Sequence, residues 1–176
     1  RNQRAPSLAT NGTDYLVVWD DSRNWETSGK DIYGARIEGS SGTILDPEGF
    51  VVTNAPRHQE EASVVFGGNR YYVVWRGWNG EGEWEGSHIS GTAVLTTGAS
   101  AVVAMVFHVD DYDSAHILPR ISFDGDHLVA VWADNRNQKG KWDLYGKAVD
   151  LMGQEAFSVA PDTKYASVLG EGNGRS

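Results

Sequence analysis

A short apolar run that ends in tryptophan occurs three times along the chain, at residues 15–19, 71–75 and 127–132. The final tryptophans of these runs are 56 and then 57 residues apart. A fixed period of this order is the mark of repeat folds, in which each repeat is one supersecondary unit. The runs are rich in valine and aromatic residues, a composition typical of β-strands that are buried on both faces.

Each repeat predicts further short strands around this run. Asn11 and Gly12 stand between two apolar runs, and both residues tolerate the positive φ that a tight hairpin needs. The expected strands of the first repeat are residues 6–10, 15–19, 32–37 and 50–53, and those of the second are residues 62–66, 71–75, 88–90 and 101–109. Those of the third are residues 120–123, 128–132, 144–149 and 157–159. The sequence therefore predicts four short antiparallel strands in each repeat.

Four antiparallel strands that cannot bury their faces alone are typical of a β-propeller blade. We expect an all-β, single repeat domain of propeller-type units, near residues 4–57, 58–117 and 118–164. Residues 165–176 resemble the start of a fourth unit. Because propellers close with about 4–8 blades, we expect a fragment of a longer propeller, or a ring completed by another copy. The alternatives are the β-trefoil and β-prism folds, which also use threefold repetition but have no place for a fourth start.

The charge balance excludes some classes of partner. The chain has 24 acidic and 15 basic residues, which gives a net charge of −9. Nucleic acids and anionic membranes are bound by clustered lysine and arginine, so neither is expected. The absence of cysteine excludes disulfides, thiolate metal sites and cysteine nucleophiles. No apolar run approaches the roughly 18–20 residues that span a bilayer, so no membrane insertion is expected.

The first repeat contains the strings DYLVVWDDSR at residues 14–23 and DIYGAR at residues 31–36. They resemble a repeat of large exported bacterial and archaeal proteins that are predicted β-propellers of the cell surface. The match covers the first and third repeats, but the second only in its first half, because Arg76-Gly77-Trp78 stands where the first repeat has residues 20–23. The resemblance implies a propeller fold and an extracellular or cell-surface location, and loosely implies adhesion or scaffolding.

The three repeated tryptophans, Trp19, Trp75 and Trp132, end equivalent strands. They offer either a ring of platforms for sugar stacking or packing between repeats, with each indole N–H donating to a backbone partner. We favour packing, because the tryptophans follow a buried strand in every repeat.

An aspartate–arginine pattern follows two of these tryptophans. Asp21, Arg23 and Asp31 recur as Asp134, Arg136 and Asp143. Carboxylates in a loop are ligands for a cation. An arginine within the cluster supplies the same positive charge, so we favour a structural clasp in which Arg23 pairs with Asp31.

The densest acidic cluster is Asp110, Asp111 and Asp113, in the expected connection between the second and third repeats. Three carboxylates within four residues are a candidate Ca²⁺ site, and a solvated loop is the interpretation we favour. We expect no cofactor other than this candidate Ca²⁺.

The loop at residues 78–84 is where the repeat breaks, and local departures of this kind tend to carry function. It places Trp78, Glu81, Glu83 and Trp84 among glycines. Indole faces stack on sugar rings and carboxylates accept hydroxyl hydrogen bonds, so these four are the candidate ligand-binding residues. A tolerated insertion explains the loop equally well.

Taken together, these patterns predict a non-catalytic binding, adhesion or assembly module of an exported or cell-surface protein. Its expected partners are another copy or the remaining blades of the same protein, together with glycans. One alternative is a carbohydrate-binding lectin. The other is a propeller glycosidase, in which the carboxylates of the loops, such as Glu83 and Asp111, converge on one site.

Overall fold

The computed structural model describes residues 2–78, 86–96, 101–138 and 140–153. The described residues contain eleven β-strands and no helix, so the all-β prediction is confirmed. The strands are β1 (Gln3–Thr10), β2 (Tyr15–Asp21), β3 (Asp31–Ile37), β4 (Phe50–Thr53), β5 (Gln59–Gly67), β6 (Arg70–Trp78), β7 (Ser87–Leu95), β8 (Val102–Ser114), β9 (His116–Phe123), β10 (Leu128–Asp134) and β11 (Asp143–Val149). The last expected strand, at 157–159, and the repeat start at 165–176 lie outside the described residues.

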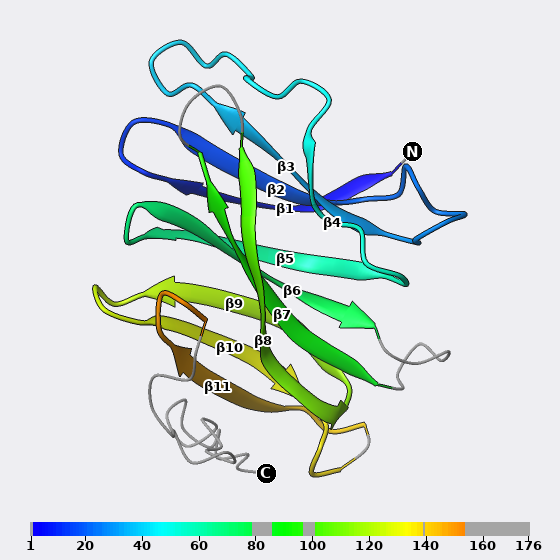
Figure 1. Ribbon diagram of the computed structural model, residues 1–176. Helices are drawn as coiled ribbons and strands as arrows, with labels where there is room; N and C mark the ends of the chain where they lie inside the picture. Colours follow the sequence, from blue (N-terminus) through cyan, green and yellow to red (C-terminus); the bar gives the residue numbers. More distant parts are fainter. Residues whose placement is uncertain (1, 79–85, 97–100, 139, 154–176) are drawn as a thin grey trace, which may run out of the picture.

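The strands form three antiparallel sheets, each of which follows the chain order. Sheet 1 has the order β1-β2-β3-β4, sheet 2 the order β5-β6-β7-β8, and sheet 3 the order β9-β10-β11. The sheets are stacked one after another, from blue through green to orange in Figure 1. The first strands of neighbouring sheets contact each other, β1 with β5 and β5 with β9. We call the contact of sheets 1 and 2 the first junction, and that of sheets 2 and 3 the second junction.

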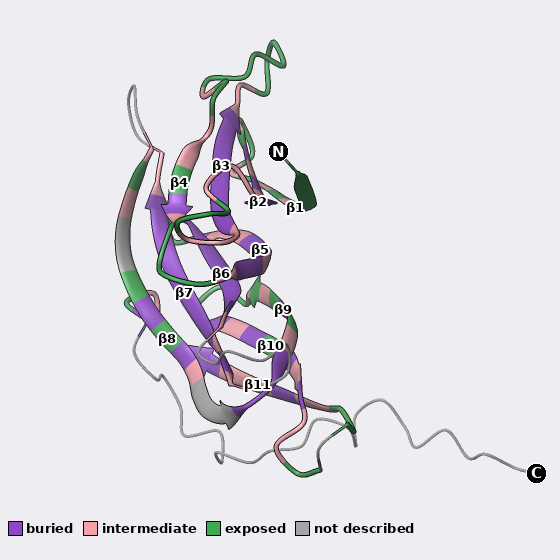
Figure 2. Ribbon diagram, turned by 90° about the vertical axis from the view of Figure 1, so that its right-hand side faces the viewer, coloured by how far each residue is buried: buried purple, intermediate pink, exposed green. Residues whose placement is uncertain are grey.

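Each junction contains its own apolar core. The first core consists of Leu16, Val18, Ile32, Val52, Ala62, Val64, Tyr71, Val73, Trp75 and Val94. The second consists of Tyr72, Val74, Ile89, Ala93, Phe107, Val109, Leu128, Ala130, Trp132, Tyr145 and Val149. Successive side chains of a strand point to opposite faces, so β6 supplies alternate residues to the two cores. The strands β5, β6 and β7 of sheet 2 are therefore largely buried on both faces, as the purple central strands of Figure 2 show, whereas the edge strand β8 exposes Val102 and Val106.

The first strand of every sheet contains a β-bulge that the sequence pattern does not predict. Ala5, Glu61 and Leu118, 56 and then 57 residues apart, all have positive φ values between 51° and 60°. The pairing of each first strand with its neighbour shifts register at this point. Such a conformation is costly for residues other than glycine, and its recurrence in three sheets indicates that the stacking requires it.

The bulges turn backbone N–H groups toward the preceding sheet. At the first junction, Glu61 N–H donates to Asp20 Oδ1 (2.9 Å) and Val64 N–H to Ser7 Oγ (3.2 Å). At the second junction, Leu118 N–H donates to Glu61 Oε2 (2.7 Å) and Ile121 N–H to Ser63 Oγ (3.3 Å). Both junctions thus use one carboxylate and one serine as acceptors.

The acidic segment at residues 110–113 does not lie in a connection, so that prediction is wrong. These residues belong to β8, whose pairing with β7 extends to Ser87 and Ser114. Because aspartate is depleted in strands, the sequence did not predict that these residues belong to a strand. β8 is the last strand of its sheet, and charged residues are common on such edges because they discourage pairing with other chains.

Candidate functional site

The aspartate and arginine residues that recur in the first and third repeats form a clasp, but with partners other than those expected. Arg23 pairs with Asp21, at 2.7 Å between Nη2 and Oδ2, and its guanidinium lies 3.9 Å from the centre of the Tyr33 ring. Asp31 instead accepts from Asn24 Nδ2 at 2.9 Å. The predicted pairing of Arg23 with Asp31 is wrong, because the Arg23 guanidinium is held by the Asp21 carboxylate and the Glu48 carbonyl.

Sheet 3 repeats this clasp with the equivalent residues. Arg136 pairs with Asp134, at 2.8 Å between Nε and Oδ2, and lies 4.1 Å from the centre of the Tyr145 ring. Asn137 Nδ2 donates to Asp143 Oδ2 at 3.0 Å. The clasp therefore holds the loop after the second strand against the third strand, in both sheets.

Sheet 2 has no aspartate at the clasp position. Gln59 takes over one role of that aspartate, which is to accept the indole N–H of the tryptophan. Trp19 Nε1 donates to Asp21 Oδ2 at 3.0 Å, whereas Trp75 Nε1 donates to Gln59 Oε1 at 2.7 Å. Gly77 stands at the position of Asp21, and His88 and Gln59 fill the space beside it. These indoles pack between strands but donate to side chains rather than to the backbone, and the buried Trp132 Nε1 has no hydrogen-bond partner.

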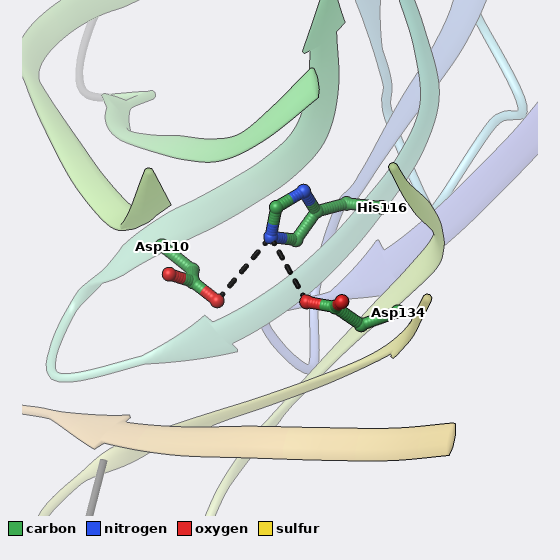
Figure 3. Close-up of side chains that lie close together, drawn as sticks. All are labelled: Asp110, His116 and Asp134. Atoms are coloured by element: carbon green, nitrogen blue, oxygen red, sulfur yellow. Dashed lines mark hydrogen bonds and ion pairs between the residues drawn. The ribbon is translucent and has the colours of Figure 1, made fainter. Parts of the chain in front are cut away.

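A charged cluster seals the second junction. His116 Nε2 lies 3.3 Å from Asp110 Oδ2 and 3.2 Å from Asp134 Oδ2, as Figure 3 shows. Arg136 Nη2 contacts both of the same carboxylate oxygens. His116 and Asp134 are fully buried, and the other ring nitrogen of His116 lies 3.1 Å from the Ser114 carbonyl.

The aspartates and histidine of this cluster are metal-ligand types and lie close enough together to hold an ion. A cation would compete with Arg136 for the same two oxygens. Burial opposes the charge of Arg136, but its hydrogen bonds to the two aspartates outweigh burial and raise its pKa. The arginine thus provides the neutralisation that a metal would provide, and the arrangement is suited to holding sheets 2 and 3 together.

At the first junction the corresponding region is built around Glu60. Its carboxylate pairs with Lys30, accepts from Trp78 Nε1 at 2.9 Å, and lies 3.5 Å from Arg76 Nη1. Burial opposes ionisation of Glu60, but the hydrogen bond and charge of Lys30 outweigh it and lower the pKa. Because the Trp78 N–H is held by Glu60, the indole has a fixed orientation at the edge of the junction.

Trp78 is one wall of an aromatic cleft at this junction. The cleft has a volume of about 480 Å³ and is lined by Trp25, Thr27, Ser28, Gly29, Arg57, His58 and Trp78. The ring centres of Trp25 and His58 are 4.8 Å apart, and those of His58 and Trp78 are 5.5 Å apart. We call this the aromatic cleft.

The floor of the aromatic cleft depends on a glycine. Gly29 has a φ of +85°, and a Cβ added to it would lie 2.7 Å from His58 Nδ1. That nitrogen accepts the Lys30 N–H at 3.1 Å. Burial, followed by the charge of Lys30, lowers the pKa of His58, which favours the neutral imidazole that this hydrogen bond requires.

A second cleft shares Trp25 with the first. It has a volume of about 420 Å³ and is lined by Asn2, Arg4, Ser22, Trp25 and Lys30. We call this the basic cleft. The Trp25 residue is 55% exposed, although an indole is among the side chains that gain most from burial. A partly exposed tryptophan that lines two clefts is a candidate contact for a ligand.

The structure brings together only part of the predicted ligand site. Trp78 lines the aromatic cleft, while Glu81, Glu83 and Trp84 lie outside the described residues. Asp110 joins the cluster of the second junction, and the side chains of Asp111 and Asp113 are likewise outside what the structure describes.

Sequence reasoning missed Trp25 and His58. Trp25 follows no apolar period and stands in the polar loop between β2 and β3, and a lone tryptophan in such a loop is a signal that could have identified it. His58 carried no signal, because its role depends on contacts with residues about 30 positions away.

Comparison with models of known protein families finds no match for this chain, and comparison with curated proteins finds none either. In the described part of the chain, no helix is long and apolar enough to cross a membrane.

Proposed function

We propose that the chain is a non-catalytic binding module and that the aromatic cleft binds carbohydrate. The observation that carries this proposal is Trp25, which is more than half exposed and lines both clefts. The C–H face of a sugar ring packs on an indole face, because both are apolar while the sugar hydroxyls remain directed outward. A shallow cleft with an exposed indole and polar neighbours matches that requirement.

The polar groups around Trp25 support the same conclusion. Thr27 and Ser28 offer hydroxyl groups, and Arg57 offers a guanidinium. Ligand sites combine apolar or aromatic walls with a few polar groups that fix orientation. Hydrolysis of a glycosidic bond requires a pair of carboxylates. The described lining of the aromatic cleft contains no carboxylate, so binding is the chemistry that it favours.

We further propose that the three sheets are blades of a β-propeller in an exported or cell-surface protein. The stacked sheets of Figure 1, the contacts between their first strands and the repeated bulges support this arrangement. The resemblance of residues 14–23 and 31–36 to the repeat of cell-surface propellers supports the location. Further blades or another copy of the chain would continue the stack, which agrees with a role in adhesion or assembly.

Titration of the protein with a panel of oligosaccharides, followed by tryptophan fluorescence and calorimetry, tests the carbohydrate proposal. We expect saturable binding with a change in indole fluorescence, and we expect Trp25→Ala to abolish it. Trp142→Ala is the matched control, because Trp142 is also exposed but belongs to the loop before β11 in sheet 3.

Two results would contradict the proposal. One is the absence of binding by any member of a broad panel of neutral and acidic glycans. The other is binding that survives in Trp25→Ala, which would place the ligand elsewhere.

A further inference from the structure

The two clefts that meet at Trp25 differ in chemistry. The aromatic cleft offers the rings of His58 and Trp78. The basic cleft offers Arg4 and Lys30, together with the polar side chains of Asn2 and Ser22. Both volumes lie within the range of about 300–1,000 Å³ that is typical of small-molecule sites. A ligand that stacks on Trp25 therefore has an aromatic environment on one side and cations on the other.

Arg4 is the cation best placed to meet a ligand. Its side chain is 59% exposed, and its one ion pair within the described part of the chain, with Glu60, is long at 3.9 Å between Nη2 and Oε2. Glu60 is itself buried and already holds the Lys30 ammonium and the Trp78 N–H. The guanidinium thus keeps most of its hydrogen-bonding groups available, and a planar guanidinium suits bidentate recognition of a carboxylate.

The local charge balance is positive, although the chain as a whole has a net charge of −9. Arg4, Lys30 and Arg76 lie around the buried carboxylates of Glu60 and Asp20, and Arg57 lines the aromatic cleft. Burial is the main cause that raises the pKa of Asp20 to about 6, so this carboxyl is only partly charged in mildly acidic solution. After burial, the charge of Lys30 is the next cause that lowers the pKa of His58, which reports the same positive field. Glu26, the exposed acid next to Trp25 in the chain, lines neither cleft.

We propose that the two clefts together bind an acidic oligosaccharide, with one sugar ring stacked on Trp25. The carboxylate or sulfate of that sugar, or of its neighbour, lies in the basic cleft against Arg4 and Lys30, and the chain continues across Trp25 toward His58 and Trp78. This inference rests on the proposed carbohydrate function and specifies its ligand class as anionic glycans.

The experiment compares three probes by calorimetry at low and high salt. They are a tetramer of galacturonic acid, its carboxyl-reduced neutral counterpart, and a sulfated heparin-type tetrasaccharide. We expect one or both acidic probes to bind at least about tenfold more tightly than the neutral tetramer, because a charge-assisted hydrogen bond is worth roughly one order of magnitude in affinity. The preference should shrink as salt screens the exposed charges.

Variants separate the role of charge from that of stacking. Arg4→Gln should weaken binding of the acidic probes far more than binding of the neutral tetramer, and so remove most of the preference. Arg120→Gln, in an exposed arginine of sheet 3, should change neither. Loss of preference for the galacturonic acid tetramer alone identifies a carboxylate site, and loss for the heparin probe alone identifies a sulfate site.

The outcomes distinguish this inference from the proposed function. Equal affinity for the neutral and acidic tetramers, with both lost in Trp25→Ala, would overturn the acidic ligand class and leave the carbohydrate site intact. An acidic preference that persists in Arg4→Gln at low salt would also overturn the assignment to the basic cleft. No binding of any probe would count against both proposals.

Discussion

The two junctions of this molecule use the same backbone device but end differently at their edges. In both, the bulge of one first strand donates N–H groups to a serine and a carboxylate of the preceding sheet. At the second junction, the ion pair of Arg136 with Asp110 and the contact of His116 with the same carboxylate fill the edge. At the first junction, Trp78 stands at the edge. The aromatic and basic clefts lie beside the loop between β2 and β3.

The difference shows that the repeated features of the sequence set the fold, while the features that vary between repeats set the chemistry of each junction. The repeat spacing sets which strands stack and where the bulges lie. The residue at the end of the second strand decides whether a junction is sealed. Asp134 supplies a carboxylate to the second junction, whereas Arg76 and Gly77 leave the first to be organised by Glu60. The same scaffold thus provides one junction suited to stability and one suited to a ligand.

The largest expected effect is the loss of Arg136. Replacing it with methionine leaves the buried Asp134 and the half-buried Asp110 near one another without their shared cation, and removing one partner of a buried ion pair typically costs about 3–5 kcal/mol. Urea denaturation gives the free energy of unfolding directly. The control is Arg23→Met, which breaks the same clasp within sheet 1 at a more exposed site and should cost only about 1–2 kcal/mol. Equal losses would show that the tie between sheets 2 and 3 adds nothing to the clasp.

The next largest effect is the pH dependence of the free energy of unfolding that comes from Asp20 at the first junction. Burial raises its pKa from 3.8 to about 6, against the hydrogen bond from Glu61 N–H that lowers it. The folded state therefore holds this proton more tightly than the unfolded chain, so the contribution of Asp20 to stability is greatest below pH 4 and falls as the pH rises to about 6. Asp20→Asn removes this loss and keeps an acceptor for Glu61 N–H.

We therefore expect the free energy of unfolding of Asp20→Asn, relative to wild type, to increase by about 2–3 kcal/mol between pH 4 and pH 7. Urea titrations at several pH values across this interval measure the difference. A difference that does not change with pH would show that the carboxyl of Asp20 ionises as readily in the folded state as in the unfolded chain.

A smaller effect is expected at the floor of the aromatic cleft. Gly29→Ala places a Cβ at a φ of +85° and within 2.7 Å of His58 Nδ1, so both strain and a displaced imidazole follow. We expect a loss of about 1–2 kcal/mol in stability together with weaker glycan binding. Gly12→Ala is the matched control, because its φ is +92° and nothing lies within 4 Å of the added Cβ. Its loss should come from the backbone alone and leave binding unchanged.

The smallest effect on stability should come from Trp25→Ala, even though it abolishes binding. Trp25 is mostly exposed and belongs to neither apolar core, so its removal should change the free energy of unfolding by less than about 0.5 kcal/mol. Thermal or urea unfolding of the variant tests this. A large destabilisation would mean that Trp25 is a structural anchor of its loop rather than a platform for ligand.

Much of the fold could be read from the sequence, and the reason lies in its apolar periods. The run at residues 71–75 predicted a strand buried on both faces, and β6 is such a strand because sheets 1 and 3 cover its two sides. The similar run at residues 15–19 predicted the same for β2, but in the described structure only one of its faces is packed against another sheet, so its burial alternates. Periodicity identifies a strand, but the number of neighbouring sheets determines its burial.

The candidate site was only partly accessible from the sequence. Trp78 stood out because it interrupts the repeat, but its partners Trp25 and His58 come from two other loops. Arg23 and Arg136 were recognised as clasp residues, but the partner of Arg23 was expected at Asp31, at the start of the next strand, whereas it is Asp21. Contacts that depend on side-chain direction at the end of a strand are not encoded in spacing.

The sequence by itself determined that this protein is an all-β chain of repeated antiparallel strands, because apolar runs, turn residues and a constant period are local properties. Only the tertiary structure decided that Ala5, Glu61 and Leu118 adopt a bulge, that β8 includes an acidic segment, and that the two junctions differ. These features arise from contacts between residues far apart in the chain, where the packing of one sheet on the next outweighs local conformational preference.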